Sequence, residues 1–140
     1  AAGRAAIAHA CFDQPAAATA PSLIVVVALV DALEPGTDYV RDRFDAEARG
    51  GDPAPIHAAY RAFHRPADIA TWACGQCNFA AENILLQAAH LGLGSCPIGG
   101  FDEAALREAA GVQAGEVPAL AIAVGRCAEG QPARVRKLAY

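Results

Sequence analysis

One stretch of the sequence, residues 72–102, limits most strongly what this chain can fold into: WACGQCNFAAENILLQAAHLGLGSCPIGGFD. From Asp68 to about Gly92 the apolar residues recur mostly at steps of three and four, which predicts a long helix with a single apolar stripe. Nearly the whole helix is weakly polar. We therefore expect it to lie at the centre of the molecule, or between two subunits.

A glycine-containing segment, residues 95–100, follows this helix. We predict a tight loop there, because Asp102 is a good N-cap for a further helix at residues 103–110 and Gly111 stands where a C-terminal glycine belongs. The two adjacent glycines, Gly99 and Gly100, have two possible interpretations. They can supply the positive φ angles of an ordinary turn between helices, or they can leave bare backbone as a platform for a planar ring.

Two apolar segments predict strands. Residues 22–30 (SLIVVVALV) are β-branched and continuously apolar, which is typical of a central strand covered on both faces. Residues 118–124 (PALAIAV) predict a second strand. Because sheets usually contain about four to six strands, we expect a partner, or a part of the domain missing from this sequence, to supply the others.

The other predicted elements are helices and a connection. Helices are expected at residues 4–12, 38–48 and 56–63, with Asp38 as the N-cap of the second. Residues 16–21 are expected to be a linker.

Length and charge exclude several classes of protein. A chain of 140 residues is most naturally one domain, here residues 1–140. The net charge of −4 and the pI near 5.5 argue against a nucleic-acid-binding protein. The longest apolar run, residues 23–30, is too short to cross a bilayer, and the sequence shows no charged start followed by an apolar signal core. We therefore expect a soluble, cytoplasmic protein without membrane contact.

The cysteines and histidines do not predict a metal site. Cys74 and Cys77 form a CxxC motif, but they fall about two turns inside a predicted helix, where packing is the favoured interpretation and a redox dithiol the alternative. No second CxxC or HxxxH pair completes a zinc site, and the four histidines are dispersed. The five cysteines do not resemble a secreted disulfide framework.

Two longer segments together resemble a known family. The order FAAENILLQAAHLGLGSCPIGGFDEAALREAAGV and then EVPALAIAVG, with APSLIVVVA earlier in the chain, is similar to the central and C-terminal parts of the flavin-dependent nitroreductases. The resemblance covers residues 20–30 and 72–136 and is weak between residues 31 and 66. It implies an α+β fold, with a nitroreductase-like central sheet flanked by helices.

The resemblance also implies a cofactor and its site. Members bind FMN without a covalent link at the interface of a homodimer, and they pass a hydride from NAD(P)H through the flavin to an acceptor. The segment that lies along the flavin ring, where a backbone N–H approaches the flavin N5, corresponds to Pro97, Ile98, Gly99 and Gly100. Two basic residues, one apart, often hold the FMN phosphate, and they correspond to Arg134 and Arg136.

The acceptor side is less defined. The residues expected to line it are Phe44, Tyr60 and Phe63, and no catalytic acid can be named. The acceptor is expected to be a nitro compound, a quinone or a similar small molecule. In place of the acidic residue found in many members this chain has Gly99, and we expect the family's front part, with its arginine- and serine-bearing segment, to be missing from this sequence.

Two alternatives therefore remain open. One is a non-catalytic or degenerate nitroreductase-fold subunit with a structural or binding role. The other is a dithiol redox protein that uses Cys74 and Cys77.

Overall fold

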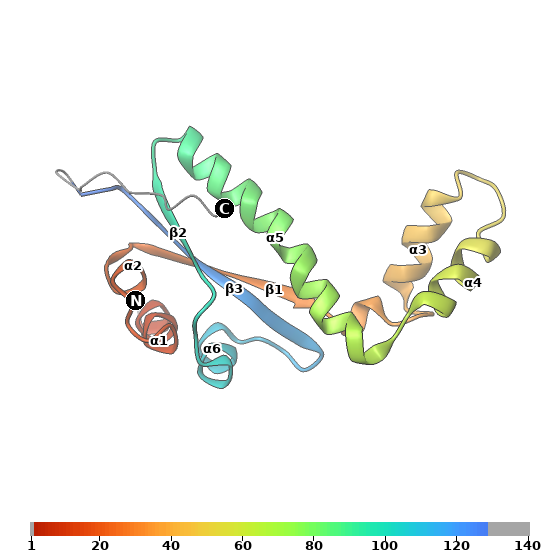
Figure 1. Ribbon diagram of the computed structural model, residues 1–140, viewed down its shortest axis with the longest axis horizontal. Helices are drawn as coiled ribbons and strands as arrows, with labels where there is room; N and C mark the ends of the chain where they lie inside the picture. The colour runs from red at the N-terminus through yellow and green to blue at the C-terminus, as the bar shows by residue number, and fades with distance from the viewer. Residues whose placement is uncertain (1, 129–140) are drawn as a thin grey trace, which may run out of the picture.

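A computed structural model describes residues 2–128, which form three strands and a set of helices (Figure 1). The strands are β1 (Ser22–Leu29), β2 (Gly94–Ile98) and β3 (Glu116–Gly125). They make one antiparallel sheet in the order β1-β3-β2. The described part of the chain therefore combines helices with a sheet, as predicted, and this sheet is antiparallel with one strand more than predicted.

The centre of the sheet is β3 and not β1. Ile24 and Leu29 of β1 are 39% and 54% exposed, whereas residues 120–123 of β3 are all buried. The prediction that residues 22–30 form a central strand covered on both faces was wrong. A continuous apolar run indicates burial in general, but it does not tell which strand has neighbours on both sides.

The segment at residues 95–100 is also different from the prediction. Its first part belongs to β2, and only Gly99 and the residues after it form a loop. Pro97 fits a strand here because β2 is an edge strand, so a residue without an N–H can sit where the backbone points away from the sheet. Pro118 is tolerated in β3 for a related reason, since the pairing with β1 is irregular at Val27 and β2 ends before this point.

Two layers of helices cover the sheet. The 25-residue α5 (Pro66–His90) lies on one face, and α1 (Ala2–Ala10), α2 (Pro15–Thr19) and α6 (Glu103–Ala110) lie on the other (Figure 1). Side chains of β3 alternate between these layers. Ile122 packs with Ala81 of α5, while Ala121 and Ala123 pack with Cys11 and the helices of the opposite face.

The helix ends agree in part with the prediction. Asp102 caps α6 by accepting a hydrogen bond from the Ala105 N–H at 2.9 Å, and Gly111 ends it in the left-handed region at φ 68°, both as predicted. Residues 16–21 are not a plain linker, because α2 occupies most of them. The guanidinium of Arg4 donates to the carbonyls of residues 17, 18 and 20 at 3.1–3.2 Å, which satisfies the C-terminal end of that short helix.

A helical arm extends from one end of the sheet (Figure 1). It consists of the short 3₁₀ helix η1 (Asp31–Leu33), α3 (Asp38–Glu47) and α4 (Ala54–Phe63). Both longer helices confirm the prediction, but the N-cap of α3 is Thr37 rather than Asp38. The Thr37 hydroxyl accepts from the Val40 N–H at 3.3 Å, and Asp38 lies in the first turn, where its charge favours the helix N-terminus.

Candidate functional site

The outer edge of β2 and the loop after it present unused backbone. Pro97 is exposed and has no N–H, so in the antiparallel ladder it occupies a position whose polar groups point away from β3. A Cβ atom built on Gly99 would meet nothing within 4 Å. Outside the regular helices and strands of residues 2–128, no hydrogen bond uses the N–H of Gly99 or Gly100. This edge is open and offers hydrogen-bond donors to a ligand.

The loop is held from behind by the junction of α1 and α2. Gln14 Nε2 donates to the Gly100 carbonyl at 2.8 Å, and the Asp102 N–H donates to the Ala10 carbonyl at 2.8 Å. Ile98 is 2% exposed and its side chain lies in the core beneath the sheet. Of the four residues predicted for this site, Ile98 can thus contact a ligand only through its backbone.

A pocket of about 470 Å³ and mixed polarity lies beside the start of β2. Its walls include Ser95 and Cys96 of β2, Thr19 of α2, and Arg126 and Cys127 just after β3. The sequence analysis did not single out Arg126, although its place directly after a predicted strand was the available signal. Arg134 and Arg136, the predicted phosphate ligands, lie outside the described residues.

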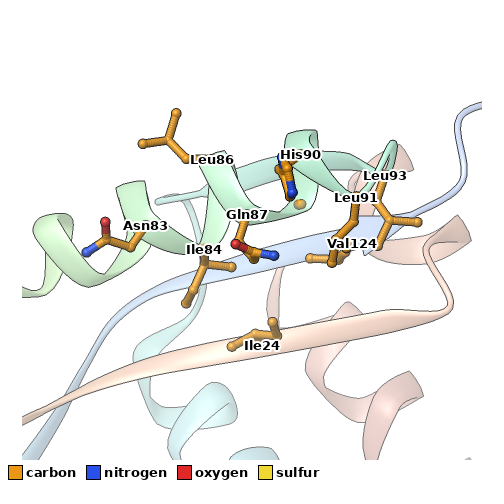
Figure 2. Close-up of a pocket in the computed structure, with 10 residues that line it drawn as sticks. Ile24, Asn83, Ile84, Leu86, Gln87, His90, Leu91, Leu93 and Val124 are labelled. Carbon is orange, nitrogen blue, oxygen red and sulfur yellow. The ribbon is translucent and has the colours of Figure 1, made fainter.

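A wider apolar groove of about 690 Å³ runs between α5 and the sheet (Figure 2). Ile84 of α5 and Ile24 of β1 lie on opposite sides of it, and Leu91, Leu93 and Val124 close one end. Ile24 and Leu91 remain 39% and 62% exposed. The groove therefore leaves apolar surface uncovered next to the outer face of α5.

The outer face of α5 has the composition of an interface. Trp72, Phe79 and Leu86 recur at intervals of seven residues and are 47%, 70% and 59% exposed. Glu82 is the one charged residue between positions 71 and 89. Exposed helices of globular proteins usually carry several charges on their outer face, and charge depletion with aromatic residues marks the core of protein–protein interfaces. We call Trp72, Phe79 and Leu86 the α5 seam.

The predicted acceptor-side residues lie in the arm and at its elbow with α5. Phe44 packs edge-on against Tyr60 with ring centroids 5.0 Å apart, and the Tyr60 hydroxyl donates to the Leu33 carbonyl. Burial, with a smaller effect of the Glu34 charge, raises the pKa of Tyr60. Tyr60 and the 75% exposed Phe63 border a small apolar cavity of about 140 Å³, whereas Phe44 does not.

Trp72 and His64 line the same cavity, and the sequence analysis missed both. Their spacing along the chain contained no recognisable motif. His64 follows Phe63 at the end of α4, and the bend between α4 and α5 brings Trp72 to the same cavity.

The CxxC cysteines lie within α5, as the packing interpretation predicted. Burial raises the pKa of both thiols, with smaller contributions from Glu103 at Cys74 and from Cys74 at Cys77. A raised pKa disfavours the reactive thiolate. Across residues 2–128, no three histidine, cysteine or acidic side chains gather in a way that could hold a metal ion. In the same part of the chain, no helix combines the length and apolar character needed to span a membrane.

Comparison with known proteins points to one family. The model of the Nitroreductase family matches residues 2–126. No curated relative matches the sequence.

Solved structures with the same fold come from several bacteria. A nitroreductase-like protein from Streptococcus mutans matches with a TM-score of 0.79 at 19% identity, over 96% of this chain and 67% of its own. A protein named as a candidate NAD(P)H:FMN oxidoreductase, from Staphylococcus epidermidis, matches with a TM-score of 0.73 at 20% identity, over 97% of this chain and 67% of its own. The NfrA1 nitroreductase of B. subtilis matches with a TM-score of 0.61 at 19% identity, over 96% of this chain and 49% of its own. At these identities the likeness shows a shared fold.

Proposed function

This chain belongs to the nitroreductase family, whose model matches residues 2–126, and we propose that it acts as an FMN-dependent oxidoreductase. In this proposal a hydride moves from NAD(P)H through the flavin to a small organic acceptor, such as a nitro compound or a quinone. The name of the Staphylococcus epidermidis protein, which mentions NAD(P)H and FMN, supports this choice of reductant and cofactor.

The open backbone at Gly99 is the observation that carries the proposal. A flavin ring is flat and needs a surface without projecting side chains. Because nothing lies within 4 Å of the position where a Cβ would stand on Gly99, the residues present fit such a ring. Pro97, Gly99 and Gly100 would contact it along the edge of β2, and Ile98 would contribute backbone only.

When bound, FMN would supply the hydride-transfer chemistry. The part of this chain is to hold and orient the ring. Backbone N–H groups at Gly99 and Gly100 would stabilise negative charge on the ring without a titrating side chain. Gln14 keeps those donors in place, because its amide fixes the Gly100 carbonyl on the opposite side of the loop.

We assign the phosphate of FMN to Arg134 and Arg136. Arginine binds phosphate through paired, charge-assisted hydrogen bonds. Arg126, just after β3, borders the pocket of mixed polarity, and this basic side chain supports a phosphate-binding region beside the start of β2.

We further propose that the protein is a homodimer that pairs through the α5 seam. The seam extends along a helix about 37 Å long, and the groove of Figure 2 continues it with uncovered apolar surface. An isologous pair would bury the same surface from both copies. The acceptor would then enter near the arm, where Tyr60 and Phe63 are assigned to line its path and Phe44 to support Tyr60.

The test is anaerobic reduction of bound flavin. Purified protein is mixed with FMN and NADPH, and the flavin absorbance is followed before and after addition of a quinone. We expect bleaching by NADPH and recovery with the quinone. Flavin that binds but is not bleached by either NADPH or NADH would instead favour a non-catalytic subunit of the same fold.

A further inference from the structure

We propose that the cavity at the elbow between α4 and α5 binds a single aromatic ring that carries a hydroxyl group, a ligand of the phenol class. This inference deepens the proposed function, because Tyr60 and Phe63 of the acceptor side border the cavity. As a binding site, however, it does not depend on flavin. It rests on the size of the cavity, on its lining, and on one buried polar side chain without a hydrogen bond.

The size and lining fit one ring. The cavity measures about 140 Å³ and is almost entirely apolar. A dry apolar cavity of about 150 Å³ is large enough to take up benzene. Tyr60, Phe63, Trp72 and Ile69, which is 8% exposed, border this cavity, and Arg65 and Asp68 also line it.

His64 is the buried polar side chain that lacks a hydrogen bond. Its side chain is 2% exposed, and neither ring nitrogen makes a hydrogen bond within the described part of the chain. Nε2 lies 3.4 Å from a Glu34 carboxylate oxygen, but this contact does not have the geometry of a hydrogen bond. A buried polar group without a hydrogen bond is costly, so a ligand that provides one gains affinity at this position.

A simple movement would bring a nitrogen of His64 to the cavity. Both nitrogens are covered, so in this conformation neither is exposed to the cavity that His64 lines. A half-turn about the Cβ–Cγ bond exchanges carbon and nitrogen positions while the ring keeps its plane. It therefore preserves the stacking on Tyr60, whose ring lies 5.7 Å away at 14°. A hydroxyl group suits this nitrogen, because it can donate to a bare nitrogen or accept from an N–H.

The test uses the single tryptophan of the chain, Trp72, as the reporter in flavin-free protein. Phenol and toluene are titrated while the tryptophan emission is followed. We expect a saturable change with both, and phenol to bind about fivefold to tenfold tighter, the value of one hydrogen bond. In His64→Phe, phenol should bind as weakly as toluene. His9→Phe, at an exposed site on α1, is the matched control and should keep the preference.

A second measurement needs no substitution. The imidazole ¹⁵N resonances of wild-type His64 should move on addition of phenol and stay unchanged with toluene. The proposal is overturned if the wild type shows no saturable change with phenol, or if a well-folded His64→Phe variant retains the preference for phenol over toluene. Because flavin is absent throughout, these results do not depend on whether the protein reduces flavin.

Discussion

Gly125, at the end of β3, packs directly against the ring of Pro21, which precedes β1. A Cβ atom on Gly125 would lie 2.5 Å from Pro21 Cδ. The proline ring cannot rotate away as a flexible side chain can. This contact sets how closely the end of β3 approaches the start of β1. It requires glycine at position 125.

We therefore expect Gly125→Ala to lower the free energy of unfolding by about 1–3 kcal/mol, the usual effect of overpacking. Urea denaturation followed by circular dichroism measures it. The matched control is Gly75→Ala in α5, where an added Cβ meets nothing within 4 Å. That substitution should raise stability by up to about 1 kcal/mol, because alanine favours a helix over glycine. Equal stabilities for the two variants would contradict the assigned contact.

Gly99→Val should weaken FMN binding while leaving the fold intact. The new side chain would project into the open space that the flavin ring is proposed to occupy, and we expect the dissociation constant to rise about tenfold or more, equivalent to at least about 1.4 kcal/mol. Quenching of FMN fluorescence measures binding, and thermal unfolding verifies the fold. An unchanged FMN affinity in a folded variant would place the flavin elsewhere.

Arg136→Ala should separate phosphate binding from ring binding. If Arg134 and Arg136 hold the phosphate, the variant should lose FMN affinity about tenfold and keep its affinity for riboflavin, which has no phosphate. Titration of both flavins measures this difference. Lys137→Ala, next in the sequence, is the control for a general loss of positive charge. The same loss for both flavins would show that the arginine acts in some other way.

Phe79→Glu should break the proposed homodimer. Phe79 is 70% exposed at the middle of the α5 seam, and a charge there would be buried without a partner in a pair of helices. We expect the dimer dissociation constant to rise at least a hundredfold, or about 2.7 kcal/mol, measured by sedimentation equilibrium. Ala46→Glu, at an exposed position of α3, should leave it unchanged. A wild-type protein that stays monomeric would contradict the proposed homodimer.

Stability should fall at alkaline pH because of the cysteines of α5. Burial raises the pKa of the Cys74 and Cys77 thiols above their ordinary value of 9.0. The unfolded chain therefore ionises first, so the stabilisation is complete below pH 9.0 and is lost as the pH rises through the higher folded values. When the free energy of unfolding is measured from neutral to alkaline pH, it should decline less in the Cys74→Ala/Cys77→Ala double variant than in the wild type. A Cys127→Ala variant, altered at an exposed position, should decline like the wild type.

Local features of the fold were predictable because each depends on neighbours in sequence. The period of apolar residues predicted α5, and the capping residues Asp102 and Gly111 predicted both ends of α6. The strand at residues 118–124 was predicted from its composition and lies within β3. The glycine pair also directed attention to the open edge that is now proposed as the flavin site.

Other features could not be predicted, because they depend on which segments meet in space. A central strand and an edge strand can have the same apolar sequence pattern. The positions of β1 and β3 in the sheet therefore followed only from the observed strand pairing. Pro97 looked like a loop residue until its place on an outer edge was known. The N-cap of α3 fell one residue earlier than predicted, since the Thr37 hydroxyl, rather than the Asp38 carboxylate, reaches the Val40 N–H.

The sequence by itself indicated the family, through a resemblance over two segments, and it predicted the long weakly polar helix from the spacing of its apolar residues. It also offered bare backbone at Gly99 and Gly100 as one of two interpretations of the glycine pair. The tertiary structure alone decided which strand is central, that the glycine loop is open, and that His64 lies buried without a hydrogen bond in the cavity that Trp72 also lines. These outcomes depend on contacts between distant segments. Propensity and periodicity depend on a few neighbouring residues, so they cannot predict such contacts.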